Sequence, residues 1–287
     1  MNKTILSLII GIIILAALFY SIGIEKIMLA LINIDLLLFT YAAIAFLAME
    51  LVLSMKLKVI APEAKIKEIF LSHEGGMFFS NLTPGRFGYF YAAYSLAKKT
   101  QTSISERIGL LTLIQGLTMV TKILILVVAF IYLSWIINIP SVLLLAFAAP
   151  VAVVVLTILI LYTRLSNHII SRIPLVGRIV RYLELMQNAA RNVRRKDIIK
   201  LLSIDPLCWV LGTIQLALLA GALGMQMDIL MVLFVSQIVS VLMFIPISPA
   251  GLGVTEGGGV ILLLLLGFTA PQSVSLILLW RINSIVV

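Results

Sequence analysis

Six long apolar runs constrain this chain more than any other feature of its sequence. They cover residues 4–24, 36–55, 108–137, 141–163, 201–223 and 229–245. A helix needs about 20 apolar residues to cross the hydrocarbon core of a bilayer, and each run is near or above that length. Three further apolar stretches, 69–97, 257–268 and 273–287, are shorter or interrupted. The sequence therefore predicts an all-α polytopic membrane protein with about six to eight transmembrane segments.

The composition agrees with a single membrane domain. Apolar residues make up 62% and charged residues 11% of the chain, against about 45–50% and 25% in soluble domains. We expect one integral membrane domain over residues 1–287, with 1–140 and 141–287 as halves of a candidate pseudo-repeat. Run 4–24 is too long for a signal-peptide core and lacks a cleavage site, so we expect a retained first helix.

The sequence shows little sign of enzyme chemistry. The single cysteine, Cys208, excludes an internal disulfide, and we expect it to be a small buried side chain. Neither a phosphate-binding Walker loop nor a Gly-x-Ser-x-Gly elbow is present, and no metal-ligand set is visible in the spacing of the residues. We therefore expect no cofactor, no metal and no enzyme activity.

The distribution of basic residues predicts how the chain is oriented. Lys and Arg number 21 against 12 Asp and Glu, a net charge of +9. In a membrane protein this excess indicates orientation and contact with anionic lipids rather than nucleic acid. The cations concentrate in three connections, 56–68, 98–107 and 164–200. We expect a multi-pass protein of the cell membrane with these connections in the cytoplasm, which requires 69–97 to form a re-entrant hairpin between the first two.

The third basic connection has helical periodicity. Its apolar residues recur at spacings of three and four, as expected for one helical stripe, at Ile179, Leu183, Met186, Ala190 and Val193. We expect an amphipathic helix at the cytoplasmic headgroup layer, preceded by a break at Pro174 and Gly177. Two interpretations remain open: an orientation signal with a solvated face, or specific recognition of lipid.

Two segments combine proline and glycine with charge inside apolar surroundings, at 73–88 and 245–259. Proline and glycine weaken helices, and unwound backbone at membrane depth must be buried in protein or line a wet cavity. Paired interruptions in two halves are typical of transporter binding sites, where the N–H groups of half-helices suit a phosphate. The hydroxyl residues Thr83 and Ser248 are candidate substrate ligands here. The residues expected to break the helices are Pro84, Gly85, Gly88, Pro246, Pro249, Gly251 and Gly253.

Four charged residues within or beside apolar segments complete the candidate substrate site: Arg86, Lys122, Glu256 and Arg281. An ionisable group inside a span costs at least about 2.5–3.5 kcal/mol, so each is a functional candidate. Arg86 could grip a phosphate with two hydrogen bonds or fix its own loop. Glu256 could neutralise Arg86 or Arg281, or carry a proton. For the deep Lys122, Glu50 is a candidate partner.

The pair His73 and Glu74 has two possible roles. A histidine beside a carboxylate can relay protons, because its ordinary pKa lies near neutral pH. The pair can also be structural or lie at the membrane interface, and the sequence favours this second role.

The breaks also carry a family resemblance. Residues 83–88 resemble the first signature of the flippase-like integral membrane family, which includes the transmembrane region of bacterial lysylphosphatidylglycerol synthases, and residues 246–257 are similar to its second signature. Trp280 and Arg281 lie where that family commonly has an aromatic-Arg pair. The resemblance implies a membrane domain that moves a lipid headgroup between leaflets without an ATPase. Tyr89 follows Gly88 where many members have an acid, and the synthase domain is not part of this sequence.

We therefore expect translocation of an anionic phospholipid or a polyprenyl-phosphate-linked sugar. Arg86, with Lys122 or Arg281, would receive the phosphate, and Glu256 would balance the charge. One alternative is an intramembrane enzyme that uses His73, Glu74 or Glu256 on a polyprenyl-linked substrate. Another is a membrane scaffold that holds a cytoplasmic glycosyltransferase through 164–200. Homo-oligomerisation is open under all three.

Overall fold

A computed structural model of the chain describes residues 25, 32–83, 86–135, 148–162, 174–245, 248–249 and 251–286. Of the features expected from the sequence, the helix over 4–24 and the break residues Pro84, Gly85 and Pro246 lie outside the described residues. Side chains of α8 up to residue 181 also lie outside the description.

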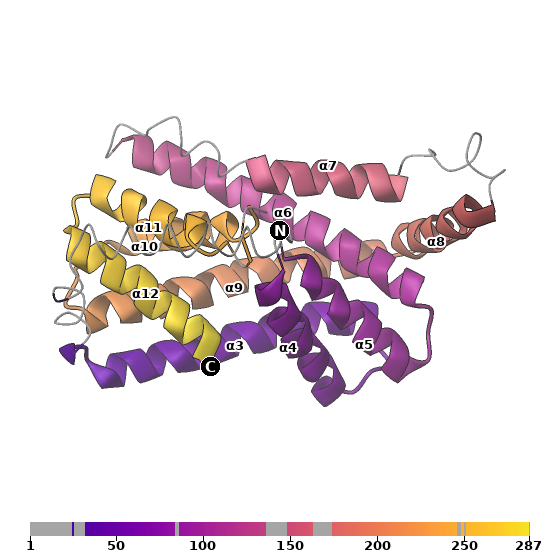
Figure 1. The fold of residues 1–287 in the computed structure, drawn as a ribbon, viewed down its shortest axis with the longest axis horizontal. Helices are drawn as coiled ribbons and strands as arrows, with labels where there is room; N and C mark the ends of the chain where they lie inside the picture. The colour runs from indigo at the N-terminus through magenta and orange to yellow at the C-terminus, as the bar shows by residue number, and fades with distance from the viewer. Residues whose placement is uncertain are drawn as a thin grey trace, which may run out of the picture.

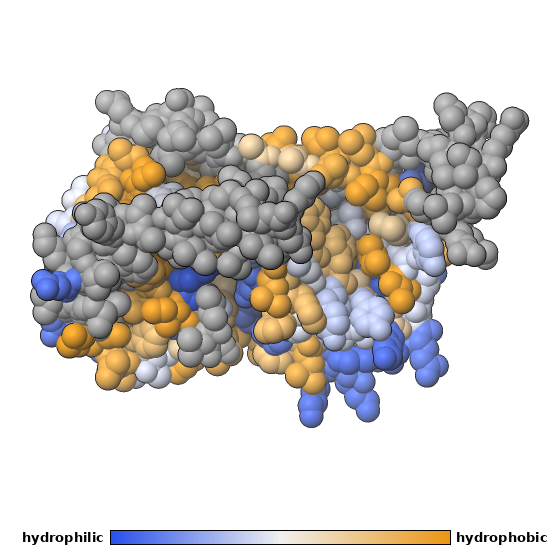
Figure 2. Space-filling model, in the orientation of Figure 1, coloured by the Kyte–Doolittle hydropathy of each residue, from blue (hydrophilic) through white to orange (hydrophobic). Residues whose placement is uncertain are grey.

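Three long helices form the frame of the molecule: α3 (Leu36–Ile60), α6 (Ile104–Ser134) and α9 (Arg195–Ala222). Each is long and apolar enough to cross a membrane, and all three run along the long axis of the molecule (Figure 1). Shorter apolar helices, α7 (Ala148–Tyr162), α10 (Ile229–Leu242) and α11 (Val254–Leu265), accompany them. The chain is thus an all-α polytopic membrane protein. Orange side chains cover much of the coloured surface in Figure 2, which agrees with a lipid-facing exterior.

One end of the frame is defined by contacts of two aspartates. The backbone N–H of Asp35, the N-cap of α3, donates to the carbonyl of Ala222 at 3.1 Å, so α3 begins where α9 ends. The hydroxyl of Tyr132, near the end of α6, donates to the Asp228 carboxylate at 3.2 Å. Asp228 is the N-cap of α10, so α10 begins beside the end of α6. We call this the Asp35 end.

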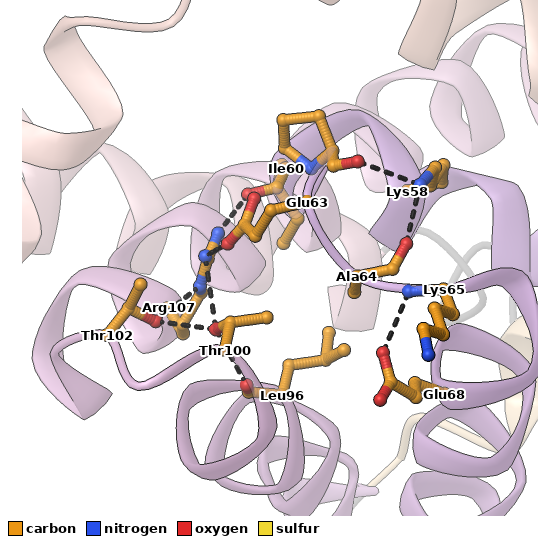
Figure 3. A network of polar contacts seen from close by, with 11 residues as sticks. Lys58, Ile60, Glu63, Ala64, Lys65, Glu68, Leu96, Thr100, Thr102 and Arg107 are labelled. Carbon is orange, nitrogen blue, oxygen red and sulfur yellow. Dashed lines mark hydrogen bonds and ion pairs between the residues drawn. The ribbon is translucent and has the colours of Figure 1, made fainter.

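Arg107 defines the opposite end, which we call the Arg107 end (Figure 3). Its guanidinium donates to the carbonyl of Ile60 and to the carboxylate of Glu63, and its Nε donates to Thr102 Oγ1 at 3.0 Å. These bonds hold the end of α3 against the start of α6. The amine of Lys58 donates to the carbonyl of Pro62 at 2.8 Å, which closes the turn after α3.

The structure corrects the predicted boundaries of two basic connections. Lys56 was expected in the connection 56–68 and Arg107 in 98–107, but both side chains are buried within helices, α3 and α6. Each has a polar partner inside the protein, which offsets the cost of burial. The turns themselves shorten to residues 61–65 and 101–103. Their assignment to the cytoplasm stays a prediction.

Two helical hairpins enter this frame from opposite ends. The first consists of α4 (Ile66–Leu82) and α5 (Phe90–Thr100), joined through η1 (Phe87–Tyr89), and it starts and finishes at the Arg107 end. The second consists of α10 and α11 and starts and finishes at the Asp35 end (Figure 1). α12 (Ala270–Val286) follows it and packs against α11, α3 and α9.

The tips of the two hairpins meet. Arg86 in the first tip, residues 83 and 86–89, lies with its Cζ 5.3 Å from the centre of the Phe244 ring in the second tip, residues 243–245, 248–249 and 251–253. The two breaks expected from the sequence therefore meet inside the molecule. Whether the first hairpin is re-entrant in a membrane stays a prediction.

The first break is narrower than the sequence suggests. α4 continues through Gly75 and Gly76 to Leu82, because these glycines face α5 rather than a turn. A Cβ on Gly75 would lie 2.9 Å from the Tyr91 ring, and one on Gly76 2.9 Å from the Ala92 Cβ. The glycines permit close packing of the two helices without ending α4.

The amphipathic segment forms α8 (Pro174–Arg191), which includes Gly177, so Gly177 is not a break. Proline is compatible with the first turn of a helix. The apolar stripe of α8 packs on protein: Ala190 is buried in a cluster with Leu113 of α6 and Leu161 of α7, and Met186 borders that cluster. Part of the face expected to meet the headgroup layer therefore covers the frame.

Candidate functional site

The first tip is built by hydrogen bonds within its own chain. The hydroxyl of Thr83 accepts from the N–H of Gly88 at 2.7 Å and donates to the carbonyl of Phe79 at 3.1 Å. A Cβ on Gly88 would lie 2.0 Å from that same carbonyl oxygen, so the chain can double back onto α4 only with glycine there. Arg86 has a φ of 61°, which is the left-handed region. Thr83, a predicted substrate ligand, has its hydroxyl engaged in holding the tip.

The side chain of Arg86 lies between the hairpins with neutral partners. Its Nε donates to the Ser80 hydroxyl at 2.9 Å, and its Nη2 lies 3.1 Å from the Met77 sulfur. Its third partner is the ring of Phe244. Among the residues that the structure describes, no carboxylate lies within ion-pair distance of Arg86. The side chain is half-buried, so it remains partly accessible.

Lys122 repeats this pattern about one helical turn away along α10. It lies near the middle of α6 and donates to the hydroxyl of Ser240 at 2.7 Å. It forms no ion pair within the described part of the chain, and the expected partner Glu50 bonds elsewhere, so that prediction is wrong. Ser240 and Phe244 are four residues apart, about one turn along α10 and the 3-10-type turn that follows it. Arg86 and Lys122 therefore contact neighbouring turns of one segment.

The second tip neutralises its own charges. The left-handed backbone of Gly251 (φ 66°) and the positive φ of Gly253 (82°) turn the chain into α11. Glu256 Oε2 accepts from the N–H of Gly253 at 2.6 Å, and its Oε1 lies 3.3 Å from Arg281 Nε. Of the two partners expected for Glu256, the structure gives Arg281 rather than Arg86.

The predicted ligand Ser248 is also engaged within the second tip. Its hydroxyl is buried and donates to the carbonyl of Leu252 at 2.6 Å. Pro249 accepts at its carbonyl from the N–H of Leu252 at 2.9 Å, so the tip closes as a tight turn.

A buried ion pair that the sequence analysis did not single out joins the three long helices. Lys56 of α3 pairs with Asp205 of α9, and also donates to the hydroxyl of Thr118 at 2.7 Å. Thr121 of α6 donates to the second carboxylate oxygen of Asp205 at 3.0 Å. The available signal was Asp205 itself, an acid inside the apolar run 201–223 and directly before Pro206.

A second buried cluster lies behind the first tip. His73 of α4 is hydrogen-bonded through Nε2 to Glu50 of α3 and through Nδ1 to the Tyr89 hydroxyl, both at 2.7 Å. Glu50 is 3% and His73 2% exposed. Glu74 follows on the same helix, and these are the side chains that could hold a metal. The structural role favoured for His73 agrees with this packing, and the connection to Glu50 could not be read from sequence spacing.

The fold and the site define a class: a helical membrane protein in which two opposed hairpins meet around cations that lack acidic partners in the described chain. The chain belongs to the family of the lysylphosphatidylglycerol synthase TM region, whose model matches residues 4–287. It is 25% identical over 209 residues to a UPF0104 membrane protein of Methanocaldococcus jannaschii. The aligned region covers 72% of this chain and 88% of that protein. No solved structure matches the chain. The family membership that the sequence analysis expected is thereby confirmed.

Proposed function

We propose that the protein translocates an anionic lipid, a phospholipid or a polyprenyl-phosphate-linked sugar, between the leaflets of the membrane without hydrolysing ATP and without changing the lipid chemically. The observation that carries the proposal is that neither Arg86 nor Lys122 forms an ion pair among the described residues. Arg86 lies between the hairpins, Lys122 contacts α10 from α6 about one helical turn away, and both bond only hydroxyl, sulfur or aromatic partners among the described residues.

Cations in this position favour an anionic ligand for an electrostatic reason. Charged groups inside a membrane protein are costly unless they are paired. The other central cations, Lys56 and Arg281, already have carboxylates, whereas Arg86 and Lys122 form no ion pair among the described residues. A phosphate supplies oxygens for two parallel bonds from the guanidinium and a point contact for the ammonium.

The opposed hairpins suggest how a headgroup could reach this site from either side. The first hairpin separates the site from the Arg107 end and the second from the Asp35 end, and their contact at Arg86 and Phe244 lies between. Movement of one hairpin at a time would open the cations to one leaflet, as broken helices do in transporters. The acyl or prenyl chain would remain in lipid. A gradient or downhill flow would supply the energy.

The paired charges have a supporting role in this proposal. Glu256 holds Arg281 and caps α11, so neither is available to a phosphate without breaking that pair. Thr83 and Ser248 shape the tips from within. The substrate site therefore narrows from the set expected from sequence to Arg86 and Lys122.

A liposome assay tests the proposal. The purified protein is reconstituted into vesicles that contain traces of a labelled polyprenyl phosphate, a polyprenyl-phosphate sugar or an aminoacylated phosphatidylglycerol, and an outside-only reagent measures how fast each becomes accessible. We expect acceleration for one headgroup class and its loss in Arg86→Gln and Lys122→Gln. Arg191→Gln, an exposed cation of α8, is the matched control and should transport normally.

Two results would contradict the proposal. Folded, inserted protein that accelerates none of these lipids would favour the scaffold alternative. A lipid recovered in chemically altered form would favour the intramembrane enzyme.

A further inference from the structure

We propose that Glu50, His73 and Glu74 form a binding site for one divalent metal ion of the zinc or manganese class, a site that does not depend on the proposed lipid transport. One ligand atom from each of the three side chains lies within 4.8 Å of the other two. Glu50 comes from α3, whereas His73 and Glu74 come from α4. A bound ion would therefore fasten the first hairpin to a long helix of the frame.

The imidazole of His73 is already oriented for this task. Its Nδ1 is hydrogen-bonded to the Tyr89 hydroxyl, and its Nε2 faces the carboxylate of Glu50. Metal-binding histidines characteristically use the second ring nitrogen to bond an outer partner, which fixes the tautomer and the ring orientation. Tyr89 occupies that outer position. The ring of His73 also meets the Tyr89 ring edge-on, with centroids 5.6 Å apart.

Glu74 supplies an independent indication of a missing ligand. Its Oε1 is shut off from solvent and has no hydrogen-bond partner among the described residues. A buried ionised oxygen without a partner is costly. A cation beside Glu50 and His73 satisfies the oxygen directly.

The charge balance of the cluster points the same way. A protonated His73 balances only one of the two carboxylates, which leaves one negative charge beside the buried side chains of Glu50 and His73. Arg86 is within electrostatic range of Glu50, but its nitrogens bond Ser80 and Met77, and it forms no ion pair with either carboxylate. A doubly charged ion with a neutral His73 brings the cluster to zero, and the proton between His73 and Glu50 leaves to water.

The donor set selects the kind of metal. Magnesium and calcium prefer oxygen ligands alone, whereas imidazole together with carboxylates suits zinc and related transition metals. Three protein ligands leave a further position for water, as in zinc sites of the open type. The rest of the chain offers few competing ligands, because its only other histidine is His168 and its only cysteine, Cys208, is buried.

The test measures metal bound to the full chain, purified in detergent without a polyhistidine tag. The protein is stripped with a chelator, incubated separately with Zn²⁺ and Mn²⁺, passed over a desalting column and analysed by inductively coupled plasma mass spectrometry. We expect one ion per chain in the unaltered protein and in His168→Gln, and loss of the ion in Glu74→Gln and His73→Gln. Glu256→Gln, which alters a buried carboxylate outside the cluster, should retain the ion.

Tyr89→Phe distinguishes a positioning role from a structural one. It removes only the hydroxyl that orients His73, so metal should still bind but about 10–100-fold more weakly. Metal should also raise the thermal midpoint of the unaltered protein and not that of Glu74→Gln. Monodisperse protein that retains no metal above the level of His73→Gln would overturn the proposal. Equal retention in Glu74→Gln would overturn it too, since the ion would then be bound elsewhere.

Discussion

The two hairpins have the same outline but differ in how their charged side chains are paired. The second tip encloses its charge, because Glu256 both caps α11 and pairs with Arg281. Arg86 in the first tip has neutral partners, and Lys122 likewise donates to a neutral hydroxyl group. The tips also differ in how they turn: glycines take the positive φ values in the second, whereas Arg86 itself takes one in the first. Breaking a helix inside a membrane protein therefore makes a place for charge, and the local carboxylates decide whether that charge is available to a ligand.

The sharpest way to break this comparison is to destroy one tip by shape alone. Gly88→Ala places a Cβ 2.0 Å from the Phe79 carbonyl oxygen, which backbone movement must relieve, and we expect a loss of more than about 3 kcal/mol in unfolding free energy. Gly224→Ala is the control: it has a positive φ but open space around it, and should cost about 1–2 kcal/mol. Denaturant titration in detergent measures both, and equal losses would contradict the close approach.

Removing the carboxylate of the second tip should rank next. Glu256→Gln leaves Arg281 buried without its acidic partner, so we expect a loss of about 3 kcal/mol in stability. The double variant Glu256→Gln with Arg281→Met should recover part of that loss, because no buried charge then lacks its counterion. A single variant as stable as the unaltered protein would show that the pair does not carry the second tip.

Arg86→Gln should give the reverse pattern. Since Arg86 has no carboxylate partner in the described chain, its removal strands no opposite charge, and the stability change should stay below about 1 kcal/mol. Transport of the anionic lipid should fall at least about tenfold, which corresponds to about 1.4 kcal/mol. The liposome assay and a thermal melt of the same preparation report the two quantities. A strongly destabilised variant would mean that Arg86 is part of the scaffold.

The smallest effect concerns the contact between the tips. Phe244→Leu keeps an apolar side chain but removes the ring beneath Arg86, and a cation–π contact of this kind is worth about 0.5–1 kcal/mol. We expect faster opening of the hairpins, measured as increased hydrogen exchange at residues 86–90, with little change in melting temperature. Unchanged exchange would mean that the contact does not hold the hairpins together.

Much of the fold could be predicted because the bilayer fixes helix length and helices satisfy their own backbone. The run 36–55 begins with α3 and stops a few residues before its end, and the run 108–137 differs from α6 by a few residues at each end. Those ends were missed because Lys56 and Arg107 were assigned to solvent, whereas Asp205 and Glu63, distant in sequence, draw them into the protein. A partner many residues away leaves no mark in local composition.

The sequence predicts which charged residues lie at the candidate site, but not which of them form ion pairs with one another. Arg86, Lys122, Glu256 and Arg281 stand out as charges in apolar surroundings, which one-dimensional reasoning detects. Which of them are neutralised depends on the packing of α10, α11 and α12. Nothing in the spacing of His73 and Glu50 indicates that they touch.

The bonds of Arg107 to Ile60 and Glu63 have a consequence for the order in which the chain folds during synthesis. Its partners Ile60 and Glu63 lie 47 and 44 residues earlier in the chain, so the ribosome has already delivered them when Arg107 emerges. The long helix α3 and the first hairpin can close as a unit while α7 to α12 are still unmade. The bond between Glu256 and Arg281 has to wait for the last helix. A nascent chain stalled after α6 should therefore already contain a folded first tip. Arg86 in that tip lacks its contact with Phe244, because Phe244 has not yet been translated.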